Sequence, residues 1–402
     1  MVVVKRAVVT GIGVVAPSGL TTEDHWRSTL AGERHVSELD GMLVGQVPGF
    51  AAEGAVDPRL IIQTDRWTWM SLAATRQALD DAKYDPAAHD PYATSVVLAS
   101  GSGGNEFGQR EIQALWSKGR RAVTAYQSIA WFYAASVGQT SILHGTKGPN
   151  QVLVSEGAGG LDSLGAARRV IRRGTPTVIA GGTEAPLSPY ALVCQRTSER
   201  LSATGYRPFD ADADGHVPGE GGAVLIVEDA AAAAERGAQQ IYGEIAGYAA
   251  THDAHHPERP APDCAQLVRA MRKALADAGV TPDDVGFVFA DGAATPALDA
   301  LEARAIREVF GRPVPVTAPQ GLIGRLCSGG GALTVATALL ALRDGIVPAV
   351  GNLARPGHDL DLVREPRQLA ADVVLVNARG FGGFNSSIVL KRYREEGLRD
   401  AG

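Results

Sequence analysis

Short apolar runs rich in β-branched residues alternate along the chain with longer, Ala-rich amphipathic stretches. Runs of the first kind predict strands, and apolar residues recurring every three or four positions predict helices. Their alternation is typical of an α/β fold. The predicted strands are 7–10, 95–98, 152–154, 177–180, 223–228, 287–290, 373–377 and 387–390, and the predicted helices are 65–84, 104–118, 160–173, 262–279, 298–310 and 330–343.

Two segments of the chain follow the same order of elements. VLVSEGAGGLDSLGAARRVIRRGTPTVIAGG (152–182) runs strand, small-residue turn, helix, glycine and strand. VTAPQGLIGRLCSGGGALTVATALLALRDGIVPAVGN (316–352) repeats that order at similar spacing. This similarity predicts two fused, related halves, 1–237 and 238–402.

Composition narrows the classes of function. The 402 residues are enough for one large domain or two coupled ones. A net charge of −6 argues against nucleic-acid binding, which needs an excess of Lys and Arg. No apolar run approaches the roughly 20 residues of a membrane span, and the N-terminal residues do not have the pattern of a signal peptide. Three widely spaced cysteines (Cys194, Cys264 and Cys327) indicate a cytoplasmic protein without a disulfide framework.

Three patterns suggest binding chemistry but each lacks a required part. Gly11-Ile-Gly13 follows a strand as in dinucleotide-binding sites, but no helix begins there, which favours a tight turn. Asp210–Gly215 resembles the start of a calcium loop that has Gly221 where a bidentate Glu is needed. The 252–256 histidine cluster has no spacing that aims imidazoles at one metal, which favours a polar loop. No metal and no cofactor are therefore predicted.

Four segments, in this order along the chain, carry a family resemblance. They are VVTGIGVVAPSG (8–19), AGGTEA (180–185), RPFDADADGHVPGEGGAVLIVED (207–229) and RGFGGFNSSIVL (379–390). Together they resemble the β-ketoacyl synthases of the thiolase superfamily. The resemblance implies a thiolase-like α/β fold of two pseudo-duplicated halves, each a five-stranded sheet between helices, in a five-layer αβαβα arrangement.

The resemblance also implies catalytic groups that this chain lacks. A ketosynthase uses a Cys nucleophile at a helix N-terminus, two His residues and a supporting Lys. The matching Cys position is Gly157, the first His position is Asp291, and the Lys and second His positions are Gln320 and Arg325. Asp291 would repel a malonyl carboxylate, and Arg325 cannot exchange protons near neutral pH. We therefore expect no catalytic residues and no Claisen condensation by this chain alone.

A ketosynthase-like chain without these groups resembles the chain length factors, the β subunits of bacterial type II polyketide ketosynthases. REIQALWSKG (110–119), AWFYAASVGQTSILHGTKGP (130–149) and LDSLGAARRVIRRGTP (161–176) favour this group. Membership implies antibiotic (polyketide) biosynthesis in an acyltransferase complex. The β subunit forms a heterodimer with a catalytic α subunit, and an acyl carrier protein serves the complex. The growing polyketide enters a tunnel between the subunits.

We accordingly predict a non-catalytic subunit that shapes this tunnel and sets polyketide chain length. Two alternatives stay open. One is a malonyl-carrier-protein decarboxylase or priming enzyme that uses another group. Cys327 is the cysteine nearest the motifs, although its Gly/Ser-rich turn favours a packing role. Many chain length factors carry Gln at the Cys position, and Gly157 cannot supply that amide. The other alternative is a structural pseudoenzyme that only stabilises the catalytic subunit.

The predicted helix 104–118 offers a candidate tunnel face. Asn105, Gly108 and Ile112 stand at i, i+3 and i+7 and so share one side of the helix. Periodicity alone leaves open that Ile112 is ordinary core and Gly108 a close helix contact. The resemblance assigns this stretch the gate residues, where short-product members have bulkier side chains. A glycine and an aliphatic residue here predict a product longer than an octaketide.

Overall fold

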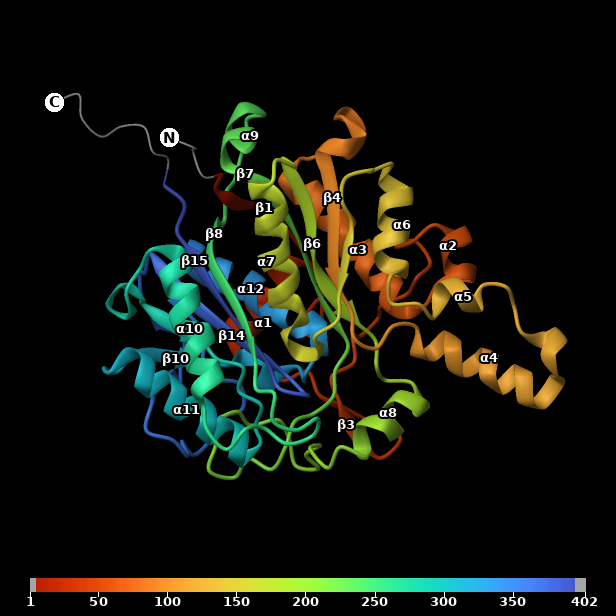
Figure 1. The fold of residues 1–402 in the computed structure, drawn as a ribbon. Coiled ribbons are helices and arrows are strands. Elements are labelled where there is room, and N and C mark those ends of the chain that lie inside the picture. Colours follow the sequence, from red (N-terminus) through yellow and green to blue (C-terminus); the bar gives the residue numbers. More distant parts are fainter. Residues whose placement is uncertain (1–4, 395–402) are drawn as a thin grey trace.

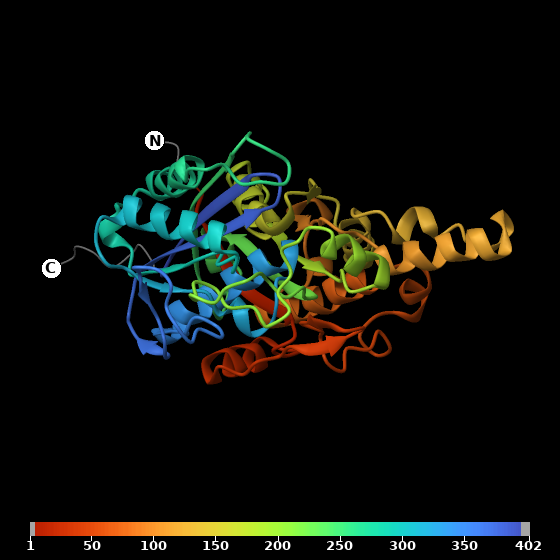
Figure 2. The same ribbon diagram turned by 90° about the horizontal axis from the view of Figure 1, so that it is seen from below.

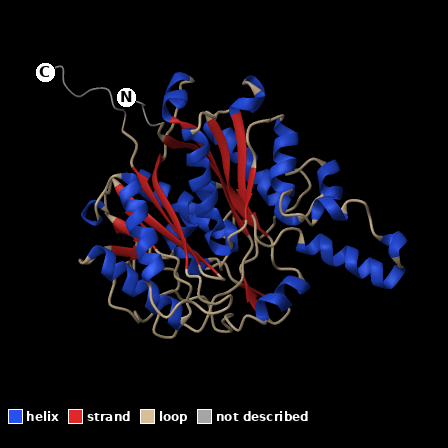
Figure 3. Cartoon of the chain, viewed as in Figure 1, coloured by secondary structure: helices blue, strands red, loops and turns tan. Residues whose placement is uncertain are grey.

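The computed structural model of the chain describes residues 5–394. Residues 1–4 lie outside this range. They begin the N-terminal segment in which we expect no signal peptide. An eleven-stranded mixed sheet runs through the molecule, flanked by helices (Figures 1 and 3). The α/β fold class is confirmed.

The sheet has two parts with the same pattern of pairing. In the order β1-β7-β6-β4-β5 the first two pairs are antiparallel and the last two are parallel. The order β8-β15-β14-β9-β10 repeats this pattern, and the short β12 adds a parallel edge. The strands are β1 Ala7–Val15, β4 Thr94–Ala99, β5 Gln151–Leu153, β6 Thr177–Glu184, β7 Gly221–Asp229, β8 Gly243–His252, β9 Phe287–Phe289, β10 Pro315–Thr317, β12 Asp361–Leu362, β14 Val373–Gly380 and β15 Phe384–Lys391.

The two parts meet where β1 pairs with β8. Only two residue pairs, Val8 with Glu244 and Val9 with Gly243, join them. The five-stranded sheets implied by the resemblance are therefore continuous with each other. The division of the chain at 237/238, between α9 (Ala230–Glu235) and β8, stays a prediction.

Helices form layers on both sides of each part of the sheet. Outside the first part, α3 packs on β1 and β7; α7 and α12 lie between the two parts; α10 and α11 cover the second part (Figure 1). This is the five-layer arrangement. The main helices are α1 Thr22–Ala31, α3 Arg66–Ala82, α4 Asn105–Lys118, α6 Ala135–His144, α7 Gly159–Arg172, α8 Pro189–Arg196, α10 Ala265–Ala278, α11 Pro296–Phe310 and α12 Cys327–Asp344.

Short elements complete the fold. They are α2 Pro58–Gln63, α5 Gln127–Ala130, the 3₁₀ turns η4 Glu156–Ala158 and η6 Pro319–Leu322, and the paired strands β2 Ser37–Leu39 with β3 Met42–Val44 and β11 Ile346–Val347 with β13 Arg367–Gln368. The helix α4 projects from the body as an arm in both ribbon views (Figures 1 and 2). None of the helices between residues 5 and 394 combines the length and apolar character that a membrane crossing requires.

The tight turn predicted at Gly11 and Gly13 is wrong. Both residues lie inside the continuous strand β1. A Cβ atom at Gly13 would stand 1.9 Å from the carbonyl oxygen of Ala74, and one at Gly11 would stand 2.2 Å from that of Ala78. The glycines are there because α3 crosses the strand at backbone contact, which is also why no nucleotide loop forms.

The internal repeat differs from its prediction at one strand. The segment after α12 forms only the two-residue β11, paired with β13 outside the main sheet. The place that β6 holds in the first part is taken by β14, which likewise lies between an antiparallel and a parallel neighbour. An insertion between α12 and β14 therefore separates the helix from its strand in the second half.

Candidate functional site

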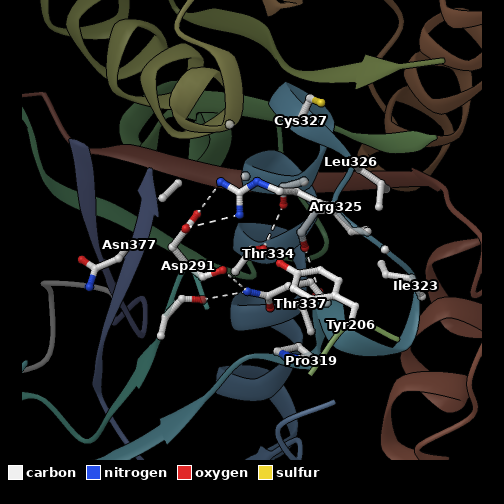
Figure 4. Close-up of a pocket in the computed structure, with 18 of the residues that line it drawn as sticks. Tyr206, Asp291, Pro319, Ile323, Arg325, Leu326, Cys327, Thr334, Thr337 and Asn377 are labelled. Atoms are coloured by element: carbon white, nitrogen blue, oxygen red, sulfur yellow. Dashed lines mark hydrogen bonds and ion pairs between the residues drawn. The ribbon is translucent and has the colours of Figure 1, made fainter. Parts of the chain in front are cut away.

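The four positions that the resemblance assigns to catalytic groups line one cavity beside the N-terminus of α12. Gly157 comes from η4, Asp291 follows β9, Gln320 lies in η6, and Arg325 precedes α12. Figure 4 shows the Arg325 and Asp291 side chains pointing toward each other across this cavity. Its free volume is about 50 Å³. That holds a few water molecules, since each needs about 10–15 Å³.

A buried ion pair occupies the middle of the site. Arg325 Nη2 lies 3.2 Å from Asp291 Oδ1, and Arg325 Nη1 lies 3.3 Å from Asp291 Oδ2. The side chains are only 10% and 7% exposed. Arg325 Nη2 also donates to the carbonyl of Arg379 at 2.5 Å, while the backbone N–H of Arg379 donates to Asp291 at 2.9 Å. The pair is thus tied at both ends to β14.

Arg325 is permanently charged in this setting. Burial by itself would lower the pKa of its guanidinium, but nearby Asp291, with Tyr206 and Glu156, outweighs burial and raises that pKa well above its usual value. A cation that cannot release a proton cannot act as a general acid or base. Arg325 therefore occupies the site and balances the charge of Asp291 without taking part in proton transfer.

Gly157 leaves the space that Arg325 uses. It lies just before α7, at the position where the resemblance implies a nucleophile. A Cβ atom there would stand 2.5 Å from the carbonyl oxygen of Arg379 and 2.8 Å from Arg325 Nη2. Any side chain at residue 157 must therefore displace backbone or the ion pair.

Gln320 forms hydrogen bonds with the backbone of the loop that follows β9 and carries Asp291. Its amide nitrogen donates to the carbonyl oxygens of Ala290, at 3.0 Å, and Asp291. The hydroxyl of Tyr206 donates to the carbonyl of Gly292 at 2.9 Å. These three bonds hold the loop that carries Asp291 against the cavity.

Two acidic residues of α11 support this loop from behind, and the sequence interpretation missed them. Glu302 accepts the backbone N–H groups of Asp291 and Gly292, each at 2.9 Å. Asp299 accepts those of Ala294 at 2.9 Å and Phe209 at 2.7 Å. Burial raises the pKa of both carboxyls to about 7, helped for Glu302 by the charge of Asp291. Their i, i+3 placement on the buried side of a predicted helix was the available signal.

Two buried histidines near the site are neutral at physiological pH. Burial, with a smaller effect of His35, lowers the pKa of His25 to about 4. Its ring nitrogens lie 2.6 Å from Ser18 Oγ and 2.9 Å from Thr337 Oγ1. Burial, and then the charges of Arg325 and Arg200, lower the pKa of His216 to about 3.

Cys327 is partly buried at the first position of α12, with a φ of +47°. Burial raises the pKa of its thiol well above the usual value, and Glu156 and Glu184 raise it further. A thiol of this kind is a poor source of thiolate. The surroundings favour the packing role for Cys327 over the nucleophilic one.

An open groove of about 560 Å³ lies on the other side of Arg325, which forms a wall of both cavities. Asn105 lines this groove, with Glu156, Tyr190 and Phe381. Gly108 and Ile112 do not line it. Gly108 is buried beneath Trp131, whereas Ile112 is 54% exposed on α4. Of the three predicted tunnel residues, Asn105 is therefore the one that lines this groove.

The arm and its surroundings expose many large apolar side chains. They are Ile112, Leu115, Trp116, Tyr126, Ile129, Trp131, Phe132, Tyr133, Ile142, Leu143 and Val154. Monomeric proteins rarely leave so many together in water, so such a surface indicates a protein partner. We call this set the arm surface.

The two other motifs have structural roles. Asp210 accepts the backbone N–H groups of Ala354 and Arg355, each at 2.7 Å, and Asp212 pairs with the Arg355 guanidinium. The histidine cluster begins at the end of β8 and continues as a loop. Within residues 5–394, no group of three or more His, Cys, Asp or Glu side chains is placed to hold a metal ion.

Comparisons with known proteins identify the family of the chain. The β-ketoacyl synthase N-terminal domain matches residues 5–233, and the C-terminal domain matches residues 242–354. The chain is 49% identical to the actinorhodin polyketide putative β-ketoacyl synthase 2 of Streptomyces coelicolor, over 96% of this chain and 98% of the relative. It is also 49% identical, with the same coverage, to the tetracenomycin polyketide synthase ketoacyl synthase β subunit of Streptomyces glaucescens.

Solved structures share the fold. A type II polyketide synthase acyl carrier protein in complex with its ketosynthase bound to the hexaketide matches with a TM-score of 0.88 at 26% identity, over 97% of this chain and 100% of that chain. The ishigamide ketosynthase/chain length factor matches with a TM-score of 0.91 at 24% identity, with the same coverage. The chain therefore belongs to the β-ketoacyl synthase family and, within it, to the type II polyketide ketosynthase β subunits, or chain length factors.

Proposed function

We propose that this chain is a non-catalytic β subunit that, in a heterodimer with a catalytic ketosynthase subunit, shapes the tunnel that sets polyketide length. The observation that carries the first half of this proposal is the Arg325–Asp291 pair over Gly157. It fills the place where an acyl thioester and a malonyl group would have to meet.

The remaining groups offer no substitute chemistry. Deprotonation of the Cys327 thiol is opposed by burial and by two carboxylates. The free volume of about 50 Å³ is far below what a substrate needs, since ligand pockets are typically 300–1,000 Å³. These features weigh against condensation, and against decarboxylation in this cavity.

The arm surface supports the second half of the proposal. Its apolar side chains require a partner, and β5, which pairs only with β4 in the described sheet, leaves one strand edge open nearby. The relative from Streptomyces glaucescens is itself called a β subunit. We assign the catalytic α subunit to this surface, with the acyl carrier protein serving the complex. The three widely spaced free cysteines fit a reducing cytoplasm.

Chain-length control is assigned to the face of α4 that bears Asn105, Gly108 and Ile112. Because Ile112 is exposed in the isolated chain, the tunnel wall at that point must be completed by the catalytic subunit. The expectation of a product longer than an octaketide now rests on Ile112, because the Trp131 indole occupies the space beside Gly108.

The test of the non-catalytic role is Gly157→Cys in the isolated chain. We expect no condensation of malonyl units on a carrier protein, because Asp291, Gln320 and Arg325 still supply no acid–base pair and such groups act as units. The unchanged chain together with its catalytic subunit is the positive control. Condensation by the Gly157→Cys chain alone, or acetyl product from malonyl carrier protein with the unchanged chain alone, would overturn the proposal.

A further inference from the structure

Gly103, Gly104 and Gly108, at the start of the arm, lie in close contact with residues 130–131. A Cβ atom at Gly104 would stand 2.0 Å from the carbonyl oxygen of Ala130, and one at Gly103 would stand 2.7 Å from that of Trp131. The backbone N–H of Gly104 donates to the carbonyl of Trp131 at 3.2 Å. The start of α4 and the residues after α5 are therefore fixed against each other through backbone.

The third glycine, Gly108, lies in contact with the Trp131 indole. A Cβ atom at Gly108 would stand 2.8 Å from Trp131 Cδ1 and 3.5 Å from Nε1. The indole edge thus lies directly over Gly108, and Gly108 is buried although it lies on a projecting helix. Trp131 as a whole remains 52% exposed, so part of the residue faces away from the helix.

We infer that Trp131 is a further specificity-determining residue for polyketide length: it supplies the bulk on the α4 face that residue 108 lacks. This rests on the proposed function. Residue 108 can be small and the wall still be full, because the indole covers it. The size of the tunnel at this level then depends on the pair of residues 108 and 131.

The first experiment replaces the Trp131 indole. Heterodimers containing Trp131→Ala, assayed with malonyl carrier protein, should yield longer products, with the ratio of longer to parental product rising about tenfold. Trp131→Phe should give a smaller shift in the same direction. Tyr92→Ala is the matched control, because Tyr92 is also an exposed aromatic residue (67%) and lies outside the arm surface.

The second experiment asks whether the side chains of residues 108 and 131 compete for the same space. Gly108→Phe alone must push the indole aside, so its heterodimer should assemble poorly. Trp131→Ala combined with Gly108→Phe should recover assembly and return the product distribution toward the parental length. A merely structural tryptophan would not show this compensation.

The outcomes separate this inference from the function beneath it. Retained turnover with unchanged lengths in both Trp131→Ala and Trp131→Phe would overturn the inference, as would a double variant worse than either single one. If Ile112→Phe then still alters length, only the role of Trp131 fails. If neither residue alters length while the heterodimer turns over, the proposed chain-length role itself fails.

Discussion

The cavity beside α12 and the arm formed by α4 differ in how far their side chains are exposed to solvent. In the cavity, polar groups from distant parts of the sequence are buried and pair with one another, although Gln320 Oε1 and Arg325 Nε have no partner among the described residues. The free space there holds only a few waters. On the arm, large apolar groups stand in solvent without a cover from their own chain. The first region is closed by contacts within the chain, whereas the second exposes an apolar surface suited to a protein partner.

Substitutions in the two regions should therefore have different effects. A substitution in the cavity breaks an internal network, so its effect should fall on the stability of this chain. A substitution on the arm leaves the fold intact, so its effect should fall on the heterodimer and its product.

The largest effect is expected for Asp291→Ala. It leaves the Arg325 cation buried without its partner and removes the acceptor of the Arg379 N–H. Breaking one side of a buried pair typically costs about 3–5 kcal/mol. Urea unfolding of the isolated chain should show a loss of that size.

Two controls accompany this variant. Asp212→Ala removes an ion pair whose side chains are well exposed, and should cost less than about 1 kcal/mol. Replacing Asp291 and Arg325 together with leucines should cost less than Asp291→Ala alone, because no charge is left unpaired. Equal losses from Asp291→Ala and Asp212→Ala would contradict the buried-pair account.

The second prediction concerns the arm surface. Ile142 in α6 is 75% exposed, and Ile142→Asp places a charge where the catalytic subunit should dock. Affinity for that subunit should fall about thirtyfold or more, corresponding to ~2 kcal/mol. The unfolding of the isolated chain should change by less than about 0.5 kcal/mol. Titration of the two subunits by calorimetry measures the first, and thermal melts the second.

Leu20→Asp serves as its control. Leu20 is also an exposed apolar residue, but it lies between β1 and α1, outside the arm surface. Its heterodimer should keep the parental affinity. An equal loss for both variants would mean that the arm is not the docking surface.

The third prediction uses pH to mark the cavity side. The folded-state pKa of His25 is about 4, below its usual 6.5, because burial disfavours the charged ring. The unfolded chain therefore binds a proton first as pH falls below about 6.5, and this opposes folding until pH approaches 4. Between pH 7.5 and pH 5 the His25 contribution should fall by about 2 kcal/mol.

His25→Asn isolates this effect from other titrating groups, such as Asp299 and Glu302, whose raised pKa values act in the opposite direction. The free energies of unfolding of the two proteins, measured in urea at both pH values, should converge by about 2 kcal/mol at the lower pH. A constant difference would show that the His25 ring is not the buried neutral group described.

Much of the fold could be predicted because its signals are local. Helix α7 has a strong apolar periodicity, whereas α12 is a long Ala- and Leu-rich helix that is buried on nearly all sides. Their predicted ends hold within one residue: α7 ends at Arg172, and α12 ends at Asp344, before Gly345 with a φ of 68°. The paired Gly11 and Gly13 were misread because a glycine that admits a crossing helix looks, in sequence, like a glycine that bends the chain. The strand β8 was missed, since GEIAGYAATH lacks a clear apolar alternation.

The site was predicted only in part for a similar reason. Family resemblance located Gly157, Asp291, Gln320 and Arg325, and the structure brings all four to one cavity. Resemblance aligns positions but carries no information on new contacts. That Arg325 reaches Asp291, or that the Trp131 indole covers Gly108, depends on side chains from elements far apart in sequence.

The smallest expected effect, and the one that connects the arm to the product, belongs to Ile112→Phe. Ile112 is exposed on α4 and one helical turn beyond Gly108, so a phenyl ring there need not disturb the Trp131 indole. In the heterodimer the ring should take space from the growing chain, and overpacking of a formed cavity costs about 1–3 kcal/mol. Since ~1.4 kcal/mol is a tenfold ratio, products shorter than the parental length should become dominant while total turnover is retained. Mass spectrometry of the products measures this ratio, with Ile112→Leu as the control of similar volume. If the parental length persists at full turnover, the α4 face is a docking surface alone and the chain length is set elsewhere.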